Sequence, residues 1–547
     1  MPRIALCLLL VPLFAFAGSR PARAHEHTLA AFLKRRKQQE SQVQKTTPPL
    51  ARPVALGPEP PPKPTCLTTF EILDAETKRP MAALVRVTQV KSGAAVQLPD
   101  AIKREANWYT LEPKQTIELP RGELRIEATH GLEYELRETR RELLKAEATV
   151  RLELKRFHNM AERGWRSGNT HLHLMRLTHA EAHRYLDLVP KSDGLDLVYL
   201  SHLRRIPDER DYISNLFTSA DLQRLTQGGV VFANGEEHRH NFGRGGEGYG
   251  HVMFIDIPEL VRPVSIGPGI MRSGTDGRPL QLGIRKARRD GGTVIWCHNT
   301  FGFEDTPNWL AGHVHAQNIF DGGSRGTYDI SFYRYLNLGM KVPFSTGTDW
   351  FIYDFNRVYT PVDGDLTSRR WRTSLEQGRS FITNGPLLTF AAGKREIGET
   401  LRIEKPRTVS ISAAGIGRNN FRGLELIYNG EIVATIKSAA RGGFHAAKLK
   451  HDLKLDKPGW LAVRIPIENS MNEFGKPLFA HTSPIYVEIG GKTIFRPSIA
   501  KEMIGEMTDA MATIKEKGVF ANDDERSSVL DVYERGIDTL RAKTSPE

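Results

Sequence analysis

An alternation of short apolar strands with helices, between residues 158 and 390, most constrains the fold of this chain. Five apolar runs predict strands, at 195–200, 229–233, 251–257, 293–296 and 342–346. Three intervening segments predict helices, at 219–227, 280–289 and 331–338, with Ser219 as the expected cap of the first. Such an alternation is typical of a mainly parallel sheet or barrel in an α/β protein.

Polar residues with metal-binding or catalytic chemistry close these predicted strands. The residues are His202, Glu237, His298 and Asp349, together with His173, which closes a further predicted strand. In barrels built from alternating strands and helices, functional residues gather at the carboxyl ends of the strands. The sequence therefore predicts one functional site at that end.

The pair His171 and His173 opens the region 171–315, which holds 11 of the 18 histidines. Side chains alternate along a strand, so both imidazoles of a His-x-His pair point to one face. Two imidazoles on one face can chelate a single transition metal. We therefore expect the pair to begin a metal site.

Six residues form the candidate ligand set: His171, His173, Glu237, His251, His298 and Asp349. Imidazole and carboxylate together suit Zn, Mn or Fe. Six ligands exceed what one open tetrahedral site takes, so a bridging carboxylate, Glu237, predicts two divalent transition metals. Such a pair can hold a bridging hydroxide that is nucleophilic at neutral pH, which is hydrolytic chemistry.

Other polar residues of the region are candidates for supporting, substrate-binding or structural roles. Asp321 is a candidate second-sphere acceptor or general acid, and His202 a candidate catalytic residue. Arg204 and Arg205 are surface arginines or contacts for an anionic substrate group. The pairs His238/His240 and His313/His315 are expected to be structural rather than ligands. Cys297 is expected in the core, because a strand residue beside a ligand points to the opposite face.

The first 64 residues predict an exported protein. Met1–Arg3 is a short basic segment, Ile4–Ala17 is apolar, and Ala22-Arg-Ala24 fits a cleavage site, so 1–24 is expected to be a signal peptide. Residues 25–64 are expected to be a disordered linker rich in proline and basic residues. A periplasmic or extracellular location follows, and no interior stretch approaches the roughly 20 apolar residues of a membrane span.

Charge and cysteine usage argue against a nucleic-acid-binding protein and against a disulfide-stabilised fold. Residues 1–63 carry +7 of the net charge of +12, so the excess lies mostly in the leader and linker. No nucleic-acid-binding motif accompanies that charge, and no nucleic-acid partner is expected. With Cys7 in the leader, only Cys66 and Cys297 remain, which argues against a disulfide framework.

Strand patterns flank the central region on both sides. Residues 65–157 predict a small β-sandwich, with strands at 67–73, 83–90, 121–128 and 149–154. Residues 391–497 predict a second β module, with strands at 403–412, 424–428, 431–436 and 460–465 and a hairpin at Asn429-Gly430. Residues 498–547 predict an amphipathic helical tail that covers an exposed surface.

Several ordered motifs resemble the polymerase and histidinol phosphatase (PHP) metallohydrolase superfamily, and within it the carbaryl-hydrolase-like CehA/McbA family. They are Gly168-Asn-Thr-His-Leu-His173, Ser201-His202, Gly235-Glu-Glu237, Gly250-His251, His298, Pro343-Phe-Ser-Thr-Gly-Thr-Asp-Trp350, Gly378–Leu388, Tyr428–Glu431 and Ala480–Pro484. The likeness runs from about residue 66 to 496. It implies a distorted seven-stranded (β/α) barrel over 158–390, flanked by the two β modules.

The resemblance also divides the ligands between two metals. By position, His171, His173, Glu237 and Asp349 would hold one ion, and Glu237, His251 and His298 the other. The chain departs from the family pattern at Thr178, Ser201 and Phe351, where acidic or imidazole groups are usual. All three departures fall on a third metal site, so we expect two metals, and the expectation of a phosphatase weakens.

Three functions compete at this point. The first is a secreted or periplasmic hydrolase of an ester, carbamate, amide or phosphoester in a small-molecule or polymer-derived substrate. Trp350, Phe351 and Tyr353 near the site favour a partly aromatic substrate. The second is a catalytically degenerate, metal-stabilised binding module for cell-surface polymer. A metal chaperone is disfavoured, because the ligands are spread over a folded domain. The sequence assigns no oligomeric state.

Overall fold

The computed structural model describes residues 64–205, 212–242, 248–271, 274–299, 302–323, 326–467 and 470–544. The predicted signal peptide and all of the predicted linker except its last residue lie outside the described residues. The described residues form one compact unit.

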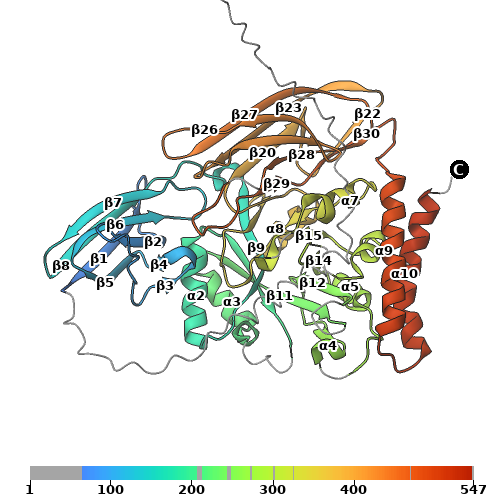
Figure 1. The fold of residues 1–547 in the computed structure, drawn as a ribbon, viewed down its shortest axis with the longest axis horizontal. Helices are drawn as coiled ribbons and strands as arrows, with labels where there is room; N and C mark the ends of the chain where they lie inside the picture. The colour runs from blue at the N-terminus through green and yellow to red at the C-terminus, as the bar shows by residue number, and fades with distance from the viewer. Residues whose placement is uncertain are drawn as a thin grey trace, which may run out of the picture. The chain divides into compact units, whose positions relative to one another are not determined.

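A mixed, strongly curled sheet lies at the centre of the fold (Figure 1). Its parallel part joins β17 (Asp349–Trp350), β9 (Trp165–His173), β10 (Leu197–His202) and β11 (Val231–His240), in that order. Beyond β11 come β12 (Gly250–Ile255) and β14 (Thr293–Trp296), both in antiparallel pairings, and then β15 (Ala316–Asn318) and β16 (Phe344–Ser345), in parallel pairings.

The curl brings the last strand back to the first. Only residues 346–348 separate β16 from β17. The Thr170 hydroxyl of β9 donates to the Thr346 carbonyl, and the Thr348 amide donates to the carbonyl of His171. The expected α/β class is therefore confirmed as a curled sheet with helices between its strands.

The structure corrects the expected end of one strand. β11 does not stop near Glu237 but continues to His240, because residues 235–240 pair antiparallel with β12 and Arg239 and His240 pair with β13 (Ser265–Ile266). Glu237 therefore lies inside a strand. The antiparallel β12 also makes the sheet mixed rather than parallel throughout.

The helices follow the strands as short, half-buried elements. Those of the central region are α2 (His179–Ser192), α3 (Ser219–Thr226), α4 (Pro268–Met271), α5 (Leu280–Arg289), α6 (Asp305–Leu310), a π-helical turn (Asp329–Tyr333), α7 (Arg334–Leu336) and α8 (Ser368–Glu376). Helix α3 is capped by Thr218 and not by Ser219: the Thr218 hydroxyl accepts from the Asp221 amide and the Asp221 carboxylate accepts from the Thr218 amide, as in a capping box.

Two sheets precede the central region and share one apolar core. One has the order β5 (Lys114–Pro120), β1 (Thr65–Asp74), β8 (Glu147–Leu154). The other has the order β3 (Ile102–Lys103), β4 (Tyr109–Leu111), β2 (Ala83–Gln89), β6 (Gly122–Thr129), β7 (Arg137–Leu143). The sequence did not predict β5 and β7. Most side chains of β7 are exposed and charged, whereas β5 buries Ile117 and Leu119.

A buried arginine links these sheets to the central region. Arg104 donates to both carboxylate oxygens of Asp193, at 2.8 and 2.9 Å, and to the carbonyl of Ile352, at 2.7 Å. Both side chains are almost fully buried. The N-terminal sheets are therefore tied to the segment that follows Asp349.

The strands after β17 extend the same hydrogen-bonded sheet. β18 (Arg357–Pro361) pairs with β9, and the pairing continues through β19 (Phe381–Thr383), β29 (Ala480–Thr482), β28 (Gly459–Ile465), β24 (Gly423–Tyr428) and β25 (Glu431–Lys437). Asn429 and Gly430 turn the β24–β25 hairpin with positive φ values of 57° and 94°, as expected.

A separate five-stranded sheet packs on these strands around a second core (Figure 1). Its order is β21 (Arg395–Glu396), β20 (Leu387–Ala392), β23 (Arg407–Gly417), β27 (His445–Leu455), β26 (Ala439–Ala440). β22 (Thr400–Ile403) pairs in parallel with β30 (Ile485–Ile489) beside it.

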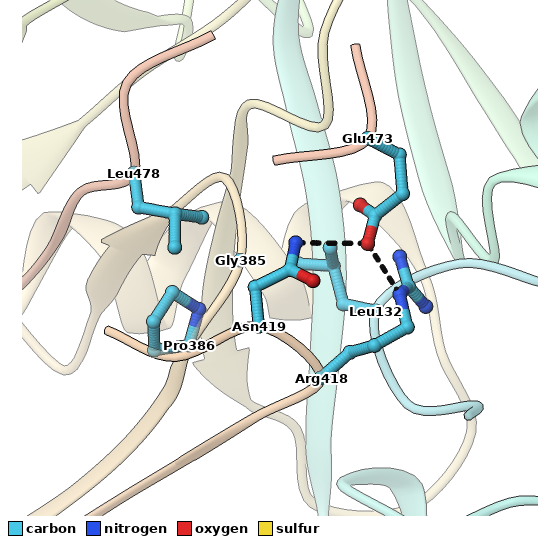
Figure 2. A pocket seen from close by; sticks show the side chains of 7 residues that line it. All are labelled: Leu132, Gly385, Pro386, Arg418, Asn419, Glu473 and Leu478. Carbon is cyan, nitrogen blue, oxygen red and sulfur yellow. Dashed lines mark hydrogen bonds and ion pairs between the residues drawn. The ribbon is translucent and has the colours of Figure 1, made fainter. Parts of the chain in front are cut away.

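A small pocket marks the contact between the N-terminal and C-terminal sheets. Arg418 donates to Thr129, to the carbonyls of Gly131 and Tyr134, and to Glu473. Figure 2 shows Arg418 and Asn419 both reaching the Glu473 carboxylate across this pocket. These polar groups satisfy one another, so the pocket has a structural role.

The predicted helical tail is confirmed as α9 (Pro497–Lys517) and α10 (Asp523–Thr544), which lie side by side (Figure 1). Both helices contact α6, and their apolar faces join the main core. None of the helices within the described residues has the length and apolar character needed to cross a membrane.

Candidate metal centre

Strand β9 brings His171 and His173 together as its alternation predicts. Their Nε2 atoms lie 2.9 Å apart and both rings are fully buried. His173 donates from Nδ1 to the carbonyl of Ser201, at 2.8 Å, and His171 donates from Nδ1 to the Asp321 carboxylate, at 2.8 Å. Because each Nδ1 carries a hydrogen, each neutral imidazole presents its Nε2 lone pair to the same point.

Two carboxylates complete a first group around this point. Glu237 Oε2 lies 3.0 Å from the Nε2 of His173 and 3.7 Å from that of His171. Asp349 Oδ1 lies 3.5 Å from the Nε2 of His171 and 3.7 Å from that of His173. The structure therefore brings together four predicted ligands from β9, β11 and β17.

A second group forms around the other oxygen of Glu237. Its Oε1 lies 3.1 Å from His251 Nδ1 and 3.6 Å from His298 Nε2. His251 donates from Nε2 to the amide oxygen of Asn241, at 2.7 Å, which leaves the Nδ1 lone pair facing Glu237. Glu237 thus belongs to both groups through different oxygens.

A third group contains His171, Cys297, His298 and Asp321. Cys297 is fully buried, as expected, but its Sγ lies 4.0 Å from His171 Nδ1, so the expectation that it points away from the site is wrong. The alternation of side chains stops because β14 ends at Trp296 and His298 adopts a positive φ of 55°.

The donor atoms of the first two groups fit a metal ion. Tetrahedral donors at ordinary metal–ligand lengths stand about 3.3–3.6 Å apart, and the atoms here are 2.9–3.7 Å apart. Asp349 Oδ1 is buried and accepts no hydrogen bond from the residues that the structure describes. A cation at the convergence point would satisfy this carboxylate and the two lone pairs together.

Two ligands have strained backbone conformations, and a glycine passes close behind a third ligand. His298 and Asp349 both have left-handed backbones, with φ values of 55° and 60°. Non-glycine residues rarely adopt this conformation, which persists where the surroundings enforce it. At Gly347 a Cβ atom would lie 2.6 Å from the Cβ of His171, so only glycine allows the chain to pass behind that ligand.

The ionisable side chains of the centre shift one another's pKa values. Burial lowers the pKa of His171, but Asp321 and Asp349 outweigh burial and hold that pKa well above its usual value. Burial likewise opposes, and Glu237 and Asp321 raise, the pKa of His298. Without a metal, protons therefore occupy the positions where a cation would bind.

Burial acts differently on the two carboxylates. It raises the pKa of Asp349, and the nearby histidines reverse only part of that effect. For Glu237, the effect of burial is exceeded by Arg239 and the surrounding histidines, which hold its pKa well below the usual value. Burial, with Arg239 next, lowers the pKa of His251 to about 3.

The two further catalytic candidates have different positions. Asp321 accepts from His171 and from the Asn318 amide, and His171 outweighs burial to hold the pKa of Asp321 below its usual value. An ionised acceptor, rather than a general acid, fits this carboxyl. His202 is half-buried at the end of β10 and belongs to none of the three groups; burial, Arg262 and His173 lower its pKa to about 4.

The residues that depart from the family pattern have structural partners instead. Thr178 caps α2 in a capping box with Glu181. Ser201 accepts the Nδ1 hydrogen of His173 through its carbonyl. Phe351 packs edge-on against Tyr185, with ring centroids 5.6 Å apart.

The remaining histidine pairs stay outside the three groups. His238 contacts Glu236 at 3.0 Å, and both fully buried side chains alternate with Glu237. His315 accepts from the Val294 amide through Nδ1 and contacts Arg288 through Nε2, which confirms a structural role.

Four residues at the centre were not among the predicted site residues. Asn241 and Asn318 hold His251 and Asp321, Cys297 lies beside His171, and Arg239 lies beside Glu237. Period-two alternation along β11 could have revealed Arg239, since it shares the face of Glu237. Nothing in the pattern singled out the two asparagines.

An aromatic wall borders the first group. The ring of Trp350 lies 5.2 Å from that of His173 and stacks on Tyr212 at 5.5 Å. Trp350 is partly exposed, so this wall reaches from the buried ligands towards solvent.

Comparisons of the chain with protein-family models, with curated proteins and with solved structures found no match.

Proposed function

We propose that this protein is a hydrolase that uses two divalent transition metals, Zn, Mn or Fe, which share Glu237. The observation that carries the proposal is that the two carboxylate oxygens of Glu237 face different ligand groups. Oε2 faces His171 and His173, and Oε1 faces His251 and His298. A purely structural metal site does not require a shared carboxylate, whereas one carboxylate facing two ligand groups would hold two ions at the ~3.5–4 Å separation of two-metal hydrolytic sites.

Two such ions would supply a water that is nucleophilic at neutral pH and would polarise the oxygen under attack. The protein's own residues hold the donor atoms in place. Asp321, the Ser201 carbonyl and Asn241 fix the tautomers of His171, His173 and His251. Burial of these groups keeps bulk water from competing for the charges.

His202 is the proposed residue for proton exchange with the reacting group. It is half-buried, and its low pKa keeps its imidazole neutral at neutral pH, so it can donate or accept a hydrogen bond. Trp350 and Tyr212 would hold an aromatic part of an ester, carbamate, amide or phosphoester substrate.

We further propose that the curled sheet is the distorted seven-stranded barrel of the PHP superfamily, in its CehA/McbA family, between two β-sandwich modules. The ordered motifs and the parallel pairs around β9 support this assignment. The structural partners of Thr178 and Phe351 favour two metals rather than three. Export to the periplasm or the cell exterior completes the proposal.

Metal analysis of the purified protein, followed by assays on aryl ester, carbamate and phosphoester substrates, tests the proposal. We expect about two transition metals per chain, and loss of both metal and hydrolysis in Glu237→Gln and His298→Ala. His183→Ala, which changes an exposed histidine on α2, is the matched control and should retain both.

Full hydrolysis by Glu237→Gln would refute this mechanism. Bound metal without turnover of any substrate class would favour the alternative, a catalytically degenerate binding module for cell-surface polymer, which the replaced third-site residues also suit.

A further inference from the structure

Arg239 is a buried cation whose Nε donor has no hydrogen-bond partner among the described residues. The residue is 7% exposed, and its Nε atom is itself buried. Its contact with Glu237 is an ion pair of 3.7 Å between Nη1 and Oε1, beyond hydrogen-bond length. A guanidinium with five donors normally makes several hydrogen bonds when it is buried.

The register of β11 and β12 places this guanidinium at the metal centre. Arg239 follows Glu237 by two residues on the same strand, so both side chains share one face. Its partner across the ladder is His251, a member of the second group. The guanidinium therefore lies at the rim of the second group, beside both Glu237 and His251.

Metal binding would leave the positive charge of Arg239 less well neutralised by nearby carboxylates. Glu237 is its ion-pair partner among the described residues, yet both oxygens of that carboxylate face ligand groups. Two divalent ions and the guanidinium together bring more positive charge than Glu237, Asp349 and Asp321 neutralise. An excess of buried positive charge is strongly unfavourable, so the loaded centre calls for a further anion.

We propose that Arg239 binds an oxyanion carried by the substrate, next to the bond that is hydrolysed. This inference rests on the proposed hydrolase function and narrows its substrates to esters or amides that bear a carboxylate or a phosphate. The fork of an arginine matches either group, because both present two oxygens at the spacing of its N–H donors. Arg239 is then a substrate-binding residue that selects charged over neutral substrates.

Paired esters and a binding titration test the proposal. 4-Nitrophenyl acetate is neutral, and mono-4-nitrophenyl glutarate carries a carboxylate at the far end of its acyl chain. In Arg239→Met, the ratio of kcat/KM for the charged over the neutral ester should fall about 10- to 100-fold. Binding of glutarate or inorganic phosphate to the zinc-loaded protein, measured by calorimetry, should weaken by a similar factor.

Two further variants control this comparison. Arg239→Lys keeps the charge but not the fork, so it should fold and lose only part of the selectivity. Arg285→Met removes an exposed arginine from α5 of the same region and should change neither the ratio nor the binding. A loss seen with phosphate but not with glutarate would assign the position to a phosphoryl group, and the reverse result to a carboxylate.

Equal losses for both esters in Arg239→Met, or unchanged binding of both anions, would overturn the proposal. If the unaltered protein hydrolyses neither ester, the proposed function is judged on the other substrate classes, and the calorimetric titration alone decides whether Arg239 binds an oxyanion.

Discussion

Gly347→Ala is a sharp probe of the metal centre, because it alters no ligand. An added Cβ would lie 2.6 Å from the Cβ of His171 and 2.9 Å from its backbone nitrogen, whereas ordinary van der Waals contact begins at 3.4 Å. Relief of the first contact therefore requires a shift of about 0.8 Å. Metal–ligand distances tolerate only about 0.2 Å, so His171 would leave its position. Loss of the geometry that positions a metal ligand costs up to about 100-fold in metal affinity, or ~2.7 kcal/mol.

Competition with a chelator for zinc measures this loss directly. Gly505→Ala is the control, since a Cβ at this exposed position of α9 meets nothing within 4 Å. We expect unchanged zinc affinity for the control and up to about 100-fold weaker binding for Gly347→Ala, with both variants folded by circular dichroism. Zinc affinity within twofold of the unaltered protein in Gly347→Ala would refute the argument that His171 ligates metal from its present position.

Three further perturbations follow from the same geometry. Asp321→Asn should weaken zinc binding about 10- to 100-fold, because the amide holds His171 less firmly than the carboxylate; unchanged affinity in the chelator assay would contradict this. Zinc affinity should rise about tenfold per pH unit near neutrality for each displaced proton, because the raised pKa values of His171 and His298 keep them protonated without metal; equal affinities at pH 6 and 8 would exclude such protons. Arg104→Met should lower the free energy of unfolding by about 3–5 kcal/mol in urea titrations, since it leaves Asp193 buried and unpaired; a loss under about 1 kcal/mol would show that the pair is dispensable.

Elements with a strong local pattern could be predicted from the sequence. Helix α5 and strand β14 have the predicted bounds, 280–289 and 293–296, because their apolar periodicity decides both structure and burial. β7 was missed because most of its side chains are exposed and its stability comes from pairing with β6. β5 was missed because its apolar alternation is limited to Ile117 and Leu119. Helix α2 was not predicted either. It contains Pro190, and Thr178 before its first residue was interpreted as a replaced ligand and not as the helix cap.

The site was predictable where side-chain chemistry alone identified residues. The six proposed ligands fall into the two groups expected from the resemblance, because imidazole and carboxylate side chains on and beside the predicted apolar strands are distinctive. Their supporting contacts were not predictable. Asn241 and the Ser201 carbonyl act through distances that depend on the curl of the sheet, and the turn at His298 that brings Cys297 inward is a backbone property. Long-range geometry of this kind leaves no periodic trace in sequence.

The metal content of the purified chain after loading with zinc or manganese tests the proposed centre most directly. Elemental analysis should give about two ions per chain for the unaltered protein and less than one for Glu237→Gln, because this carboxylate faces both ligand groups. No bound metal in the unaltered protein, or the same two ions in Glu237→Gln, would contradict a two-metal centre built around Glu237.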